Sequence, residues 1–137
     1  MCSSDLAYAK QNKLTFAKMV NKAGKTVAPT AETFQAAAAN ADWKSQPGYG
    51  VILANQPGDT SWPMTAATWI LLYKSPADAA STGEALKFFA WSYAKGADMA
   101  KDLDYVPMPV NVVGDIQKMW ASEIKDSGGK PLFTLTH

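Results

Sequence analysis

From Met64 to Tyr73 the chain reads MTAATWILLY, directly after the pair Trp62-Pro63. The centre of this run is apolar on both faces, which is the pattern of a strand buried within an α/β sheet. Proline is tolerated where a strand begins, because that position needs no donor for the ladder. The run therefore predicts a buried strand and favours an α/β fold.

One helix is predicted before this strand in the sequence and two are predicted after it. An alanine-rich helix is expected from 31 to about 40, with Thr30 as its N-cap. Apolar spacing predicts a second helix from 83 to 95, which ends at Gly96, and a last helix from about 109 to 125. The residues expected to face the core are Leu86, Phe89, Ala90 and Tyr93 in the second helix and Val113, Ile116, Trp120 and Ile124 in the last.

Two further strand regions precede the apolar run. Residues 14–20, the turn residues 21–25 and Thr26-Val27 predict a hairpin, and residues 48–54 predict a short strand. Strands that alternate with helices favour α/β over an all-α or all-β fold.

The charge composition limits the partners of the chain. Thirteen basic residues against twelve acidic ones give a net charge of +1, so no overall field attracts nucleic acid or an anionic membrane. Every one of the basic residues is Lys. Because Arg supplies the rigid fork that grips phosphate bidentately, a strong oxyanion site here would need backbone amides, hydroxyls and Lys alone.

Few side chains could carry catalysis or hold a metal. His137 is the only histidine and the last residue, and Cys2 is the only cysteine, so a histidine base, a disulfide and a thiolate cluster are all poorly supported. The densest acidic cluster is Asp98, Asp102 and Asp104, which we interpret as a solvated face because a metal needs more oxygens in one loop. We therefore predict no catalytic, cofactor-binding or metal-binding residue, and no enzyme.

Two other motifs have a simple structural interpretation. Gly128-Gly129-Lys130 is similar to part of a phosphate loop but has no Ser or Thr after it, so we predict a C-terminal turn. Thr65 and Thr68 beside Trp69 could line a ligand cleft. The simpler interpretation is that they fill a sheet, where Thr has a good propensity.

A series of short motifs runs through the chain in a fixed order. They are Tyr8-Ala9-Lys10-Gln11-Asn12-Lys13-Leu14, Gly24-Lys25, Pro29-Thr30, Phe34, Ala41-Asp42-Trp43, Trp62-Pro63-Met64-Thr65, Leu86-Lys87-Phe88-Phe89-Ala90-Trp91, Asp102-Leu103-Asp104-Tyr105, Ile116, Trp120 and Ile124-Lys125-Asp126-Ser127-Gly128-Gly129-Lys130-Pro131-Leu132. In order and spacing they resemble the phosphate-binding protein family known as PstS, over almost everything from residue 7 onward.

The resemblance implies a two-lobed periplasmic binding protein (type II) fold, of which this chain would be a C-terminal fragment. Residues 1–61 would be the end of the second lobe, with 1–6 outside the family pattern. Residues 62–137 would form the lobe crossing and the return segment that completes the first lobe. Trp62-Pro63 would then lie near the hinge, where motions concentrate in proteins that close around a ligand.

The resemblance also implies a function. Family members hold phosphate through loop hydroxyls, an Asp, an Arg and a Ser-Gly-Thr at a helix N-terminus, all supplied by sequence before the region matched here, so no residue of this chain inherits those roles. The implied protein is the periplasmic phosphate-binding component of a high-affinity ABC uptake system. Its partners would be inorganic phosphate, bound through the missing N-terminal part, and the membrane permease, with no cofactor and no nucleic acid.

Two alternatives stay open at this point. The chain could belong to a binding protein for another oxyanion, or it could be a free-standing protein-interaction domain. The first residues have neither a basic n-region nor an apolar h-region, so the sequence predicts no signal peptide, and the periplasmic location is implied by the resemblance alone.

Overall fold

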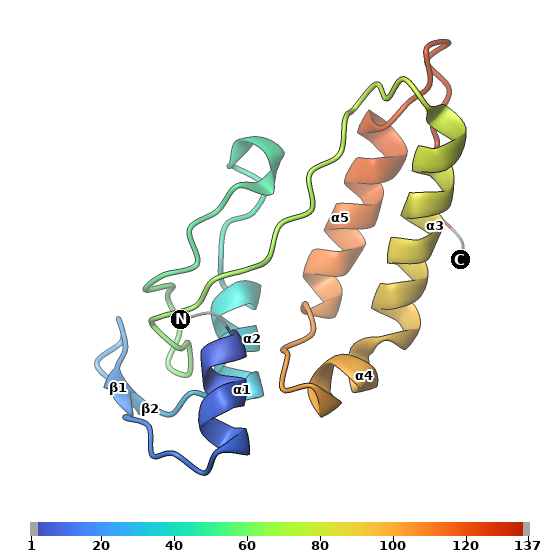
Figure 1. Ribbon diagram of the computed structural model, residues 1–137. Coiled ribbons are helices and arrows are strands. Elements are labelled where there is room, and N and C mark those ends of the chain that lie inside the picture. Colours follow the sequence, from blue (N-terminus) through green and yellow to red (C-terminus); the bar gives the residue numbers. More distant parts are fainter. Residues whose placement is uncertain (1–2, 136–137) are drawn as a thin grey trace. The chain divides into compact units, whose positions relative to one another are not determined.

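The computed structural model describes residues 3–135 and is dominated by helices (Figure 1). The elements in chain order are α1 (Ser3–Gln11), β1 (Met19–Val20), β2 (Thr26–Val27), α2 (Ala31–Ala39), the 3-10 helix η1 (Pro47–Tyr49), α3 (Ala79–Lys95), α4 (Ala97–Asp102) and α5 (Val110–Glu123). No helix of the described part is long and apolar enough to cross a membrane. Cys2 and His137 lie outside the described residues.

The chain forms two compact units. Unit 1 contains the residues up to Thr68 together with Asp98–Pro109. Unit 2 contains Trp69–Ala97 together with the residues from Val110 onward. Each unit is therefore built from two pieces that are far apart in the sequence.

The predicted hairpin is confirmed in unit 1, but its ladder is short. β1 and β2 pair antiparallel, with Met19 opposite Val27 and Val20 opposite Thr26. The turn is closed by the amide of Asn21, which donates to the carbonyl of Lys25 at 2.9 Å. Residues 14–18, which were also expected to be a strand, lie outside the ladder.

The predicted alanine-rich helix is confirmed as α2, with the same N-cap. The Thr30 hydroxyl accepts from the Thr33 amide at 3.4 Å, and the Thr33 hydroxyl accepts from the Thr30 amide at 3.0 Å, so two otherwise unpaired amides are satisfied. Phe34 on this helix packs into the core of unit 1 with Leu6, Val27 and Trp62. The hairpin, α1 and α2 are joined by this apolar cluster.

The core of unit 2 lies between α3 and α5, which Figure 1 draws side by side. Its buried residues are Leu86, Trp120, Ile124 and Phe133, and Phe89, Ala90 and Ile116 pack against them. Much of the predicted apolar stripe therefore faces the core. Tyr93 stacks on Trp120 with ring centroids 6.0 Å apart, and burial raises the pKa of its phenol.

Helix α3 begins four residues before the predicted start, because Asp78 is its N-cap. The Asp78 carboxylate accepts from the Ser81 amide at 3.0 Å and from the Ser81 hydroxyl at 2.6 Å, and these bonds hold the pKa of the carboxyl below its usual value. The helix ends at Gly96 as predicted. Helix α5 begins directly after Pro109, also as predicted.

The two other predicted strands are wrong for the described residues. Residues 48–54 contain the end of η1 and irregular chain, and residues 64–73 carry no regular structure. Within the described residues the sheet contains only β1 and β2. These two strands were predicted wrongly because a strand is defined by a hydrogen-bonded neighbour, and apolar sequence alone cannot supply that neighbour.

We expect the core of unit 2 to be sensitive to truncation. Leu86 is fully buried, so Leu86→Ala should lower the free energy of unfolding by about 2–5 kcal/mol through lost burial and a residual cavity. Leu71 is 91% exposed, so the same change there should alter it by less than about 0.5 kcal/mol. Urea unfolding followed by tryptophan fluorescence measures both. Equal effects of the two substitutions would contradict this core.

Candidate functional site

The predicted hinge pair Trp62-Pro63 is tied to unit 1 by its backbone. The Trp62 amide donates to the carbonyl of Thr33 in α2 at 2.9 Å. The Pro63 carbonyl accepts from the Asn55 amide at 2.8 Å, which closes the loop from 55 to 63. The pair therefore marks the end of an anchored loop.

The indole of Trp62 contributes packing without polar pairing. It is 2% exposed and lies 6.1 Å from Phe34 between ring centroids. Its buried N–H has no hydrogen-bond partner within the described residues. Since leaving a buried donor unpaired costs about 1–3 kcal/mol, apolar burial is what holds this side chain in place.

The closed loop is also fastened to the C-terminal end of α2. The buried Ser61 hydroxyl donates to the Pro57 carbonyl at 2.6 Å and accepts from the Asn40 side-chain amide at 3.2 Å. Gly58 sits beside them with φ of 113°. A Cβ at that position would come within 2.4 Å of the Asn40 amide nitrogen, so the loop requires glycine here.

Asn21 joins this loop to the turn of the hairpin. Its side chain is buried, and its NH₂ group donates to the carbonyls of Gly58 at 3.2 Å and Asp59 at 2.8 Å. Its carbonyl oxygen accepts from the amides of Ala23 at 3.1 Å and Lys25 at 2.9 Å. Two donors and two acceptor positions are thus all satisfied.

The sequence interpretation missed this network, although Asn21 lies among the predicted turn residues 21–25. Its polar members are amides, a hydroxyl and backbone carbonyls, none of which changes charge near neutral pH. We therefore interpret it as a rigid anchor for the chain before residue 64, which positions a segment but performs no chemistry.

Thr65 and Thr68, which we interpreted as filling a sheet, lie outside any strand, so that interpretation is wrong. Thr65 is buried, and its hydroxyl donates to the Trp62 carbonyl at 3.0 Å. Thr68 is exposed. The Thr65 hydroxyl therefore stabilises the local turn that follows the anchored loop.

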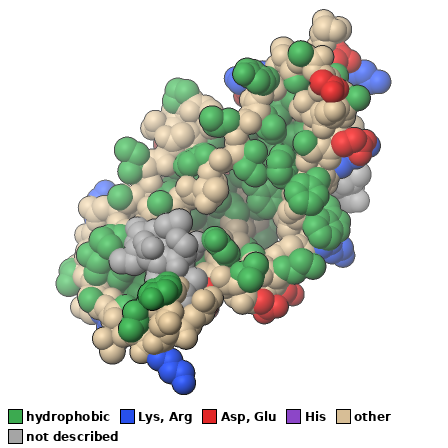
Figure 2. All heavy atoms as spheres, viewed as in Figure 1, with side chains coloured by type: hydrophobic (Ala, Val, Ile, Leu, Met, Phe, Trp, Pro, Cys, Tyr) green, Lys and Arg blue, Asp and Glu red, His purple; other side chains and the backbone are tan. Residues whose placement is uncertain are grey.

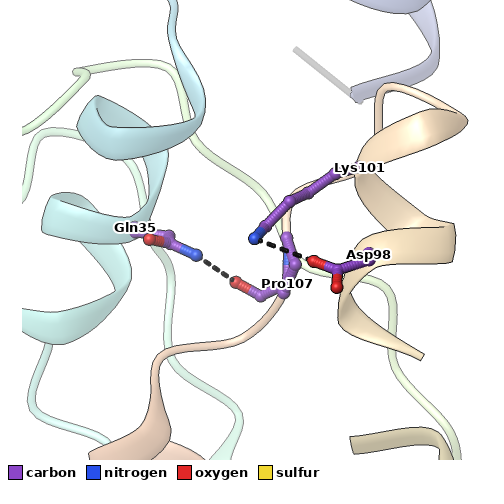
Figure 3. A network of polar contacts seen from close by, with 4 residues as sticks. All are labelled: Gln35, Asp98, Lys101 and Pro107. Carbon is purple, nitrogen blue, oxygen red and sulfur yellow. Dashed lines mark hydrogen bonds and ion pairs between the residues drawn. The ribbon is translucent and has the colours of Figure 1, made fainter. Parts of the chain in front are cut away.

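The acidic cluster is spread over α4 and the segment after it. Asp98 pairs with Lys101 at 3.3 Å, as Figure 3 shows, and Asp104 pairs with Lys10 of α1 at 3.1 Å. The described residues contain no group of three or more His, Cys, Asp or Glu side chains that could hold a metal ion. Asp98 is 92% exposed at its side chain, which agrees with a solvated face.

Residues 98–109 are joined to the rest of unit 1 by polar bonds. Besides the Lys10–Asp104 pair, the side-chain amide of Gln35 in α2 donates to the Pro107 carbonyl at 3.1 Å (Figure 3). The ion pairs are exposed, and such pairs contribute about 0–1 kcal/mol. The polar bonds therefore position residues 98–109 and contribute little to their stability.

The predicted C-terminal turn at Gly128-Gly129-Lys130 is confirmed. The Asp126 carboxylate accepts from the amides of Gly128 and Lys130, both at 2.9 Å. Gly129 has φ of 81°, and Lys125 and Pro131 form an isolated bridge across the turn. Because a carboxylate already occupies these amides, the turn has no free cradle for phosphate.

The carboxylates with a lowered pKa are capping or turn groups. The pKa of Glu32 is lowered first by its hydrogen bond with Thr30, and that of Asp42 by its hydrogen bond with Ser45. Both are fully exposed and lie at a helix start or a turn, so these shifts have structural causes and indicate no reactive centre.

The sequence of the chain is similar to those of several known proteins, although no family model matches it. The phosphate-binding protein PstS of Pasteurella multocida is 51% identical over 129 residues, which are 94% of this chain and 38% of the relative. That of Haemophilus influenzae is 46% identical over 121 residues, 88% of this chain and 36% of the relative. That of Xylella fastidiosa strain 9a5c is 45% identical over 121 residues and 33% of its length. The chain spans about a third of these relatives.

We expect Asn21 to be essential for the anchored loop. Asn21→Asp keeps the acceptor for Ala23 and Lys25 but points an oxygen at the carbonyls of Gly58 and Asp59, so it should lower the free energy of unfolding by about 1–3 kcal/mol at pH 7. Burial beside two carbonyls raises the pKa of the new carboxyl above its unfolded value. Part of the loss should therefore return as the pH falls and the protonated acid donates again.

The matched control is Asn12→Asp. The Asn12 side chain donates at 2.9 Å to the Tyr8 carbonyl on the exposed end of α1, where water can replace that bond. Urea unfolding at pH 7 and pH 4 compares the two variants. If Asn21→Asp is no more destabilising than the control, the network does not anchor the loop.

Proposed function

Because the chain belongs to the PstS family of phosphate-binding proteins, we propose that it is the C-terminal portion of the component that captures phosphate for an ABC uptake system. The observation that supports this most is 45–51% identity over 88–94% of the chain. These relatives are phosphate-binding proteins, which favours phosphate over another oxyanion. On this proposal the protein is a periplasmic binding protein and not an enzyme, and it passes phosphate to a membrane permease.

We infer further that this portion supplies scaffold and that phosphate is held by residues outside it. The chain has no Arg, and the turn that was most similar to a phosphate loop has its amides paired with Asp126. Charge-assisted donors contribute about 1.5–3 kcal/mol each, so a site without several of them binds weakly. The two-lobed type II fold, with residues 1–61 in the second lobe and 62–137 returning to the first, belongs to the same proposal.

The hinge is proposed to lie just after Trp62-Pro63. The backbone bonds of this pair fix the chain up to residue 63, and residues 64–68 follow without helix or strand. The first of the three places where the chain passes between the two compact units falls between Thr68 and Trp69. An irregular segment next to a rigid anchor is where a change of φ and ψ is absorbed most easily.

We expect the isolated chain to bind phosphate weakly or not at all. Isothermal titration calorimetry should give a dissociation constant well above about 1 µM, which corresponds to roughly −8 kcal/mol. The matched control is a chimera in which this chain replaces the aligned part of the Pasteurella multocida relative, and it should bind as the unaltered relative does. Tight binding by the chain alone, or a folded chimera that does not bind, would refute the proposal.

The same chimera tests the hinge. Pro63→Ala frees a fixed φ and should change the rate of opening by about two- to fivefold, the factor equivalent to ~0.4–1 kcal/mol. Pro47→Ala, at the exposed start of η1, is the control and should leave that rate unchanged. Stopped-flow fluorescence on phosphate release measures the rate. Unchanged opening and unchanged affinity in Pro63→Ala would remove the hinge from this position.

A further inference from the structure

Residues 98–109 interrupt the chain of unit 2 and are attached to unit 1. Ala97 before this segment and Val110 after it both belong to unit 2, whereas the segment itself belongs to unit 1. We call residues 98–109 the strap. If the strap left unit 1, the passage between Thr68 and Trp69 would be the one covalent connection that remains between the two units.

The contacts that attach the strap to unit 1 are weak. Asp104 forms an exposed ion pair with Lys10 of α1 at 3.1 Å. The carbonyl of Pro107 accepts from the side-chain amide of Gln35 in α2 at 3.1 Å (Figure 3). Val106 packs against the apolar cluster of unit 1 but is only half-buried, and none of the residues of the strap is buried. Little free energy therefore opposes the loss of these contacts.

The two ends of the strap are stiff by comparison. At its start a single residue, Gly96, separates α4 from α3, and the Gly96 amide donates to the Ser92 carbonyl at 2.8 Å. At its end Pro107 and Pro109 fix their own φ and restrict the residue before each of them. The contacts with unit 1 should therefore break more easily than the strap bends.

Asp104 has a backbone conformation that favours glycine. It lies just after α4 with φ of 61°, in a Schellman motif in which the Asp104 amide donates to the Lys101 carbonyl at 2.9 Å and the Tyr105 amide to the Ala100 carbonyl at 2.8 Å. A carboxylate is also disfavoured at the C-terminal end of a helix dipole. The ion pair with Lys10 offsets these two local costs.

We propose that residues 98–109 are a releasable strap, which the Lys10–Asp104 pair holds against unit 1 and which leaves unit 1 as one piece while the rest of that unit stays folded. The attached strap joins the two units at two passages of the chain in addition to the one after Thr68. Its attachment restrains movement between the units, and its release permits that movement. This inference concerns contacts within the chain and does not depend on phosphate binding.

Thiol labelling of the full chain in a Cys2→Ser background tests the release. In Val106→Cys the thiol is shielded by the apolar cluster while the strap is attached, so labelling should follow a local opening whose rate changes little with urea. Val27→Cys is the matched control. Val27 lies in the same cluster on β2 and is 8% exposed, so its thiol should be labelled only when unit 1 unfolds, with a steep dependence on urea. The same urea dependence for both thiols would overturn the proposal.

A second substitution tests the ion pair. Asp104→Gly removes the pair but suits the left-handed backbone, so the thiol introduced at position 106 should be labelled about two- to fivefold faster while the urea midpoint does not fall. Lys13→Gly is the control, because Lys13 ends α1 in the same motif with φ of 54° and contacts no residue of the strap within the described part of the chain. It should leave the labelling rate unchanged. Equal labelling rates in the two variants would overturn the role of the pair and would show direct labelling of a half-buried thiol.

Discussion

The side chain of Asn21 joins two segments of unit 1 that are distant in the sequence, the hairpin turn and the loop before Trp62. Its two donors bind the loop at Gly58 and Asp59, and its carbonyl closes the hairpin turn. That loop carries Trp62 into the apolar core, where it meets Phe34. A buried amide with all four bonds made costs little, whereas a half-satisfied one would be expensive, so the hairpin turn and the loop stabilise each other through Asn21.

The two units are stabilised by different means. In unit 1, polar bonds to carbonyls position irregular chain around a small apolar cluster. In unit 2, Phe89 and Tyr93 of α3 pack on Trp120 of α5, and Phe133 lies edge-on to Trp120 with ring centroids 5.3 Å apart. Aromatic packing tolerates movement of a helix along its axis less well than it tolerates changes at the surface. Unit 2 is therefore held together by packing between α3 and α5.

The proposed function agrees with the small number of strong anion donors in this chain. A capture protein needs a rigid scaffold and a few strong donors, and this part of the protein has the scaffold. Its basic residues are lysines, and its best helix caps are already occupied by side chains such as Thr30 and Asp78. Helix starts capped in this way leave fewer of their four free amides for an anion, since each amide makes one such bond.

Local features were predictable from the sequence alone. Thr30, Gly96, Pro109 and the turn at Gly128-Gly129 act through their own backbone and nearest neighbours, so helix bounds and the hairpin could be predicted, and the order of motifs identified the family. The residues 64–73 could not be placed in that way. Their apolar pattern specifies burial and pairing, but pairing depends on segments that are distant in the sequence. Within the described residues, Leu72 is the residue at the centre of this stretch that packs against the core of unit 2. The network around Asn21 was missed for the same reason, because its partners lie 37 and 38 residues away and only the folded chain brings them within hydrogen-bond distance.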